Sequence, residues 1–178
     1  MSTPAFDRRW DWPVERLWTG APAPTAEHVR VSGAATGPGL AIRVDAPFHG
    51  DPAPTGSPGP QPGLWNFEVV ELFLANDAGR YLEVEVGPHG HHWVLELDGV
   101  RRPVREGLPL ALNVERGPTR WTARATLPWS WLPAGALRVN AFAIHGLGES
   151  RRYLVMDPTG TTDQPDFHRP WTFRPLEG

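Results

Sequence analysis

None of the 178 residues is cysteine, and this absence excludes several kinds of chemistry at once. The chain cannot form disulfides, bind zinc through thiolates or use a cysteine nucleophile. A serine nucleophile has no support either, because no serine lies in the Gly-x-Ser-x-Gly pattern that exposes such a group. A chain without cysteine fits a reducing compartment, and we expect a cytoplasmic protein.

Lysine and long apolar runs are also missing. All 17 basic residues are arginine and the net charge is −3, whereas nucleic-acid-binding domains usually carry a basic stripe. No run approaches the roughly 18 apolar residues that a membrane helix needs, and the N-terminus has no apolar segment of signal-peptide length. The sequence therefore predicts neither a nucleic-acid nor a membrane partner, and it leaves protein partners unknown.

Proline and tryptophan, by contrast, are abundant, with 21 and 9 residues. Proline at this density suits loops and short strands and disfavours long helices. Residues 50–63 combine proline with glycine and small polar residues, so they cannot pair in a sheet and should form an irregular loop. The hydrophobic share of 40% supports a packed core, and the even composition predicts one domain over residues 1–178.

Elsewhere apolar and polar residues alternate with a period of two, which is typical of half-buried strands. Asp98-Gly99 is a strong hairpin signal, and a proline at the start of 128–132 favours one helical turn there. These patterns predict an all-β fold: an antiparallel β-sandwich of the immunoglobulin or jelly-roll kind, with about nine strands. The predicted strands are 28–34, 40–48, 67–74, 81–86, 91–97, 110–115, 120–127, 137–145 and 152–156.

Residues 67–74 are apolar on both faces, which predicts a central strand that is covered on both sides. If Leu72 and its alternate neighbours face the core, Glu71 lies on the other face, which we expect to be a concave outer surface. The residues that we expect to be mostly buried in the core are Leu72, Leu74, Leu82, Val84, Val86, Trp93, Leu95, Trp121 and Leu127.

Charged residues within strong strands are the most informative feature of the sequence. Glu83 and Glu85 alternate outward on the strand that follows Glu71 across a short turn, so the three carboxylates should share one patch. A carboxylate on a half-buried face needs a partner. Two explanations stay open: salt bridges to the outward-facing Arg43 and Arg124, or convergence of polar groups on a ligand.

Histidines are the second candidate group. His89 lies at a turn with His91 and His92, His145 ends a strand, and His168 follows Asp166-Phe167. We predict that His89, His145 and His168 share a face or rim with the glutamates. Imidazole and carboxylate are common ligands of transition metals, but no His-Glu-x-x-His pattern is present, so surface or hydrogen-bonded histidines are the alternative to a metal site.

A segment over residues 64–74, Leu-Trp-Asn-Phe-Glu-Val-Val-Glu-Leu-Phe-Leu, resembles the Trp…Val-Glu-x-Phe segment of family 9 carbohydrate-binding modules and their DOMON-like relatives. Further segments at 81–86, 88–90, 127–129, 142–146 and 165–168 more closely resemble a family of uncharacterised soluble proteins of bacteria and animals that share this fold. The similarity covers about residues 45–170.

This resemblance implies a sandwich with a ligand-facing concave sheet. In sugar-binding members two tryptophans clamp a terminal sugar, and the loop positions of Trp65 and Trp171 suggest them for this role. Structural calcium also occurs there, so a divalent metal such as calcium is the cofactor to consider, although Asn66 replaces the usual acidic residue after the motif tryptophan. The resulting candidate ligand-binding residues are Trp65, Glu71, Glu83, Glu85, His89, Arg124, His145, Asp166, His168 and Trp171.

The sequence therefore predicts a stand-alone binding module for a carbohydrate-like or other small polar ligand. One alternative is an enzyme, such as a metal-assisted hydrolase, that uses the glutamates and histidines; Glu83 and Glu85 could meet the separation that the two carboxylates of a glycosidase need. Another alternative is a protein-interaction domain. No motif assigns a catalytic residue.

Overall fold

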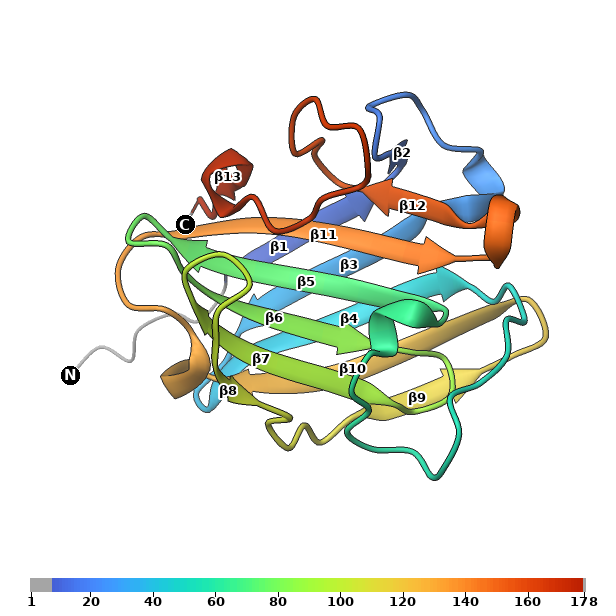
Figure 1. The fold of residues 1–178 in the computed structure, drawn as a ribbon. Helices are drawn as coiled ribbons and strands as arrows, with labels where there is room; N and C mark the ends of the chain where they lie inside the picture. Colours follow the sequence, from blue (N-terminus) through green and yellow to red (C-terminus); the bar gives the residue numbers. More distant parts are fainter. Residues whose placement is uncertain (1–7, 178) are drawn as a thin grey trace.

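The structure is a computed structural model in which residues 8–177 are described. It is a β-sandwich of two antiparallel sheets packed face to face (Figure 1). In spatial order the five-stranded sheet holds β1 (Arg9–Val14), β3 (Val29–Ala35), β4 (Gly39–Pro47), β10 (Arg120–Pro128) and β9 (Asn113–Arg116). The eight-stranded sheet holds β2 (Arg16–Leu17), β12 (Arg152–Val155), β11 (Leu137–His145), β5 (Val69–Asn76), β6 (Arg80–Val86), β7 (His92–Asp98) and β8 (Pro103–Glu106), with β13 (Arg174–Pro175) paired to β11.

The predicted all-β sandwich is confirmed, and each of the nine predicted strands is present within a few residues. Four short or edge strands are additional: β1, β2, β8 and β13. β1 escaped prediction because it contains Pro13, which an edge strand tolerates. The helical elements of residues 8–177 are single 3-10 turns, namely η1 (Thr25–Glu27), η2 (Leu64–Asn66), η3 (Trp129–Trp131) at the predicted position, η4 (Gly148–Ser150) and η5 (Pro170–Thr172).

The main core lies between the two sheets. The predicted core residues that it contains are Leu72, Leu74, Leu82, Val84, Val86, Trp121 and Leu127, all buried. Leu95 is also buried as predicted, but it lies on the opposite face of β7. The prediction for Trp93, on that same face, needs correction because Trp93 is only half-buried. Alternation marks Trp93, Leu95 and Leu97 as the more apolar face of β7. We took this face to point inward, but it is the outer face and belongs to a second hydrophobic cluster.

The outer face of the eight-stranded sheet carries a second hydrophobic cluster. Phe167 from the C-terminal segment stacks on Phe142 of β11 with 4.1 Å between ring centroids, and Phe173 packs edge-on against Phe73 of β5 at 5.9 Å. In Figure 1 this segment (red) runs along β11. The C-terminal segment therefore covers part of the outer face. The exposed concave surface that we expected is reduced to a cavity.

Residues 50–63 form the predicted irregular loop. They contain no regular strand or helix and make one isolated bridge, from Pro60 to His92. Gln61 donates its backbone N–H to the His92 carbonyl at 2.8 Å, and the His92 N–H donates to the Gly59 carbonyl at 3.0 Å. The loop is thus anchored along the start of β7. Within residues 8–177 no helix is long and apolar enough to cross a membrane.

Candidate functional site

Three glutamates converge on the outer face of β5 and β6, as predicted. The antiparallel register places Glu71 opposite Glu85 and Phe73 opposite Glu83, so all three carboxyl groups share one face. The fractional exposure is 2% for Glu71, 4% for Glu83 and 0% for Glu85. Side chains that we expected on a concave surface are therefore almost completely removed from water.

Burial is the main influence on the protonation of these carboxyl groups. It raises the pKa of Glu83 to about 8, against a smaller opposing effect of the Arg101 charge. Burial also raises the pKa values of Glu71 and Glu85 well above the usual range, and repulsion among the carboxylates raises both further. At neutral pH the group therefore holds protons that exposed glutamates would have lost.

Few polar contacts offset the burial of the Glu85 carboxyl group. Its carboxyl group lies beside that of Glu83 and near the backbone N–H of Trp65, and both affect its pKa. Even so, neither Glu85 oxygen makes a hydrogen bond of standard geometry within residues 8–177. A fully buried, unpaired carboxyl group costs stability, so its presence in a strand interior calls for a role other than packing.

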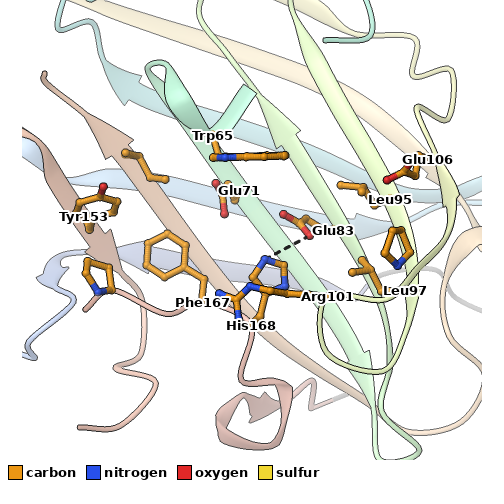
Figure 2. Close-up of a pocket in the computed structure, with 13 residues that line it drawn as sticks. Trp65, Glu71, Glu83, Leu95, Leu97, Arg101, Glu106, Tyr153, Phe167 and His168 are labelled. Atoms are coloured by element: carbon orange, nitrogen blue, oxygen red, sulfur yellow. Dashed lines mark ion pairs between the residues drawn. The ribbon is translucent and has the colours of Figure 1, made fainter. Parts of the chain in front are cut away.

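A cavity of about 420 Å³ opens above these carboxyl groups. Figure 2 shows Trp65 at one side of it over Glu71, and Phe167 with Tyr153 along another wall. Its lining residues are Trp65, Glu71, Glu83, Leu95, Leu97, Arg101, Pro103, Glu106, Ile144, Tyr153, Pro165, Phe167 and His168. We call this space the acidic cavity. Its volume lies within the range of about 300–1,000 Å³ that is typical of small-molecule sites.

Trp65 is held in place through its backbone. Gly63, with φ of 74°, enters the left-handed region that starts the η2 turn. The Arg151 guanidinium donates to the Trp65 carbonyl, and it donates at 3.1 Å to the carbonyls of both Asn66 and Gly146. Trp65 is 47% exposed, so the hydrogen-bonded η2 turn presents its side chain at the acidic cavity.

A hydrogen-bonded network forms the opposite wall. Arg101 has φ of 53°, the one non-glycine residue of the described chain in the left-handed region. Its backbone N–H donates to the Tyr81 hydroxyl at 3.0 Å, and its guanidinium donates to Asp166 at 2.9 Å. The Asp166 carboxylate also accepts the His168 backbone N–H at 3.1 Å. The β7–β8 turn and the C-terminal segment are thus tied together at the cavity.

His168 is the imidazole that belongs to the site. Its Nδ1 lies 2.8 Å from the Tyr81 hydroxyl and its Nε2 lies 3.9 Å from a Glu83 oxygen. The direction of the Tyr81–His168 hydrogen bond follows the imidazole tautomer: if Nδ1 accepts the Tyr81 proton, the neutral ring carries its proton on Nε2, which faces Glu83. Burial lowers the pKa of His168 to about 4 and raises the pKa of Tyr81 to about 12, so both are neutral near pH 7.

Two predicted histidines lie elsewhere. His145 is 3.4 Å from Glu27 and stacks on His49 with 3.5 Å between ring centroids. His89 contacts Arg116 at 2.5 Å and packs edge-on against Phe48. The prediction that His89, His145 and His168 share one rim with the glutamates is therefore wrong for the first two. His145 ends β11 and His89 lies in the turn between β6 and β7, where neighbouring loops determine the contacts.

Two further candidates also lie outside the acidic cavity. Arg124 belongs to the five-stranded sheet, where it pairs with Glu115 at 3.2 Å. Arg43 pairs there with Asp45, so neither arginine neutralises the three glutamates. Trp171 is 61% exposed and lies 5.6 Å from the Arg169 guanidinium, away from the lining residues. A clamp formed by Trp65 and Trp171 is therefore not present.

The sequence reasoning missed Arg101, Tyr153, Phe167, Tyr81 and Arg151. The Asp98-Gly99 turn signal placed a hairpin close to Arg101, but no pattern shows which turn residue points back to the sheet. For a metal, the described residues contain no group of three or more His, Asp or Glu side chains arranged to hold one. The three glutamates are better described as a carboxyl floor than as a metal site.

Fold and site together define a β-sandwich protein with an aromatic-walled cavity over buried carboxyl groups. The chain is 43% identical over 174 residues to the UPF0462 protein C4orf33 homolog of Rattus norvegicus, an alignment that covers 93% of this chain and 87% of that protein. It is 41% identical over 166 residues to UPF0462 protein C4orf33 of Homo sapiens, covering 89% and 83%. The chain belongs to the UPF0462 family.

A solved structure supports the fold. A candidate carbohydrate-binding protein from Bacteroides uniformis superposes with a TM-score of 0.72 over 93% of this chain and 84% of that chain, at 16% identity. No family model matches the sequence. The likeness to family 9 modules and DOMON-like domains therefore stays a prediction.

Proposed function

We propose that the acidic cavity binds a small polar ligand of the carbohydrate type. The observation that carries the proposal is the exposed indole of Trp65 directly beside polar groups that are otherwise buried. A sugar ring has an apolar face that suits an aromatic surface, and hydroxyl groups that need several hydrogen-bond partners.

The cavity offers matching polar groups. Glu71 and Glu83 can donate from a protonated carboxyl or accept as carboxylates, and Nε2 of His168 donates or accepts according to the imidazole tautomer. Leu95, Phe167 and Tyr153 supply the apolar remainder of the wall. The similar fold of the Bacteroides uniformis protein, which is described as a candidate carbohydrate-binding protein, supports the same ligand class.

Isothermal titration calorimetry with glucose, galactose, xylose and glucosamine tests the proposal. At least one sugar should bind the wild-type protein, and Trp65→Ala should weaken that binding about tenfold or more because the stacking surface is lost. Trp171→Ala is the matched control, since it removes another exposed tryptophan side chain outside the cavity, and it should leave affinity unchanged. Binding that survives Trp65→Ala, or no binding by any sugar, would contradict the proposal.

A further inference from the structure

We infer that the ligand of the acidic cavity carries a cationic amino group, as in an amino sugar, and that its ammonium rests on the Glu71 and Glu83 carboxyl groups. The inference rests on the proposed function and specifies the ligand class of the same site. Its basis is geometric: two buried carboxyl groups face the cavity, and no arginine of the described chain forms a salt bridge with them.

The nearest cations are committed to other partners. Arg101 donates its guanidinium to Asp166 at 2.9 Å. Arg151 uses its guanidinium on backbone carbonyls, including those of Trp65 and Asn66. Both charges act on the floor only from a distance, lowering the pKa values of Glu83 and Glu71 by less than burial raises them. Neither arginine forms a salt bridge with the floor in the described chain.

The other titratable groups around the cavity do not supply positive charge. His168 is neutral near pH 7 and Tyr81 is a neutral hydroxyl. Glu106 at the cavity wall adds a further acid. The groups that face the floor come from β5, β6, the β7–β8 turn and the C-terminal segment. Among them, acidic groups outnumber basic groups.

Glu71 is the best-placed group for a ligand. It is 2% exposed, lines the cavity, and is shown in Figure 2 below Trp65. Burial, the Glu83 charge and the Arg151 charge shift its pKa, and no hydrogen bond from the described residues contributes. A buried carboxyl group whose free side is a cavity is satisfied either by a proton or by a donor on a ligand.

An ammonium satisfies this floor better than a hydroxyl does. It has three N–H donors on one atom, so it can bridge two carboxylates, and its charge offsets their desolvation. Aromatic faces attract cations within about 6 Å of the ring centroid, and Trp65, Tyr153 and Phe167 line the same space. One compact ligand with an amino group and an apolar ring face therefore fits both the floor and the walls.

Calorimetry with a matched set of probes tests the inference: glucosamine, glucose and N-acetylglucosamine, in which the charge is present, absent or removed by acylation. At pH 7 glucosamine should bind about tenfold or more tightly than either neutral sugar. Equal or tighter binding of the neutral sugars overturns the amine inference and leaves the proposed function standing. No binding by any of the three overturns the amine inference, and it overturns the proposed function as well if galactose and xylose also fail to bind.

Proton linkage gives a second readout. Because Glu83 holds a proton near neutrality, an ammonium on the floor should displace it, and titrations in buffers of different ionisation enthalpy should show proton release with glucosamine. No proton release would overturn the placement of the amine. Glu71→Gln should reduce the glucosamine-to-glucose preference several-fold, and Glu83→Gln makes the same test if the first variant does not fold. Glu115→Gln, on the other sheet, is the control and should keep the full preference.

Discussion

Glu71 of β5 and Glu85 of β6 lie directly opposite each other in the sheet, and both are buried. Like charges in opposed positions destabilise a sheet, and loss of water penalises the charged form of each carboxyl group. The pair is compatible with folding because protonation removes the repulsion. The stability of this protein should therefore depend on pH in a way that most proteins do not show.

The free energy of unfolding should fall as pH rises from about 6.5 to 8. Glu83 has a folded pKa of about 8 against an ordinary value of 4.5, so over this range the folded protein keeps a proton that the unfolded chain has lost. Each pH unit then costs about 1.4 kcal/mol, or about 2 kcal/mol over the window from Glu83 alone. Urea denaturation at several pH values measures the slope.

Glu83→Gln should flatten this slope, and the exposed Glu115→Gln should not. His168 and His145 act in the opposite sense below about pH 6.5, because burial lowers their pKa values, and there they oppose the effect of the buried carboxyl groups. The stability that these neutral imidazoles contribute is present above their unfolded pKa and is lost as pH falls. A slope between pH 6.5 and 8 that is the same in wild type and Glu83→Gln would refute the assignment.

Leu72→Ala should lower the free energy of unfolding by about 2–5 kcal/mol, because it leaves a cavity between the sheets. Val104→Ala, at an exposed position in the short edge strand β8, should change it by no more than about 0.5 kcal/mol. Thermal or urea unfolding of both variants makes the comparison. Similar losses in the two would mean that the register of β5 is shifted by one residue.

The left-handed backbone of Arg101 predicts an unusual order of stabilities. Arg101→Gly should be more stable than Arg101→Ala by about 1 kcal/mol, because both lose the same guanidinium but only alanine keeps the steric conflict at φ of 53°. The same two substitutions at Arg102, which does not have a positive φ, should give the reverse order. If the alanine variant were more stable than the glycine variant at both positions, backbone strain at the β7–β8 turn would be excluded.

Arg151 should act on ligand binding through Trp65. Arg151→Lys cannot make the same set of bonds to the η2 carbonyls, and we expect sugar affinity to fall several-fold. In a Trp65→Ala background the same change should have almost no further effect, as a double-mutant cycle would reveal. Arg152→Lys is the neighbouring control, since Arg152 pairs with Glu27 outside the cavity. Additive losses would mean that Arg151 acts independently of Trp65.

The sequence was sufficient for the sandwich and for the convergence of three glutamates. Alternation fixes which residues of a strand share a face, and a short turn brings Glu71 within one strand of Glu83 and Glu85. The sequence was also sufficient to predict the proline-rich loop, since proline has no N–H to donate to the hydrogen bonds of a sheet.

The remainder of the site depends on contacts that no local pattern encodes. The more apolar face of β7, which carries Trp93, points away from the five-stranded sheet because it belongs to the second hydrophobic cluster. Phe167 and His168 reach the cavity because the last residues fold back over β11, and this depends on packing between segments that lie far apart in sequence. His145 was assigned to the wrong neighbours because η1 supplies its partner Glu27.

The binding of a sugar-like ligand at Trp65 can be observed directly by ¹H–¹⁵N NMR of the nine tryptophan indoles, with Trp65→Phe and Trp171→Phe used to assign two of the signals. On titration with glucosamine, the Trp65 signal should move progressively to a saturating value while the Trp171 signal stays fixed. Movement of Trp171 with Trp65 unchanged, or no movement of Trp65 under conditions where calorimetry detects binding, would contradict a ligand in the acidic cavity.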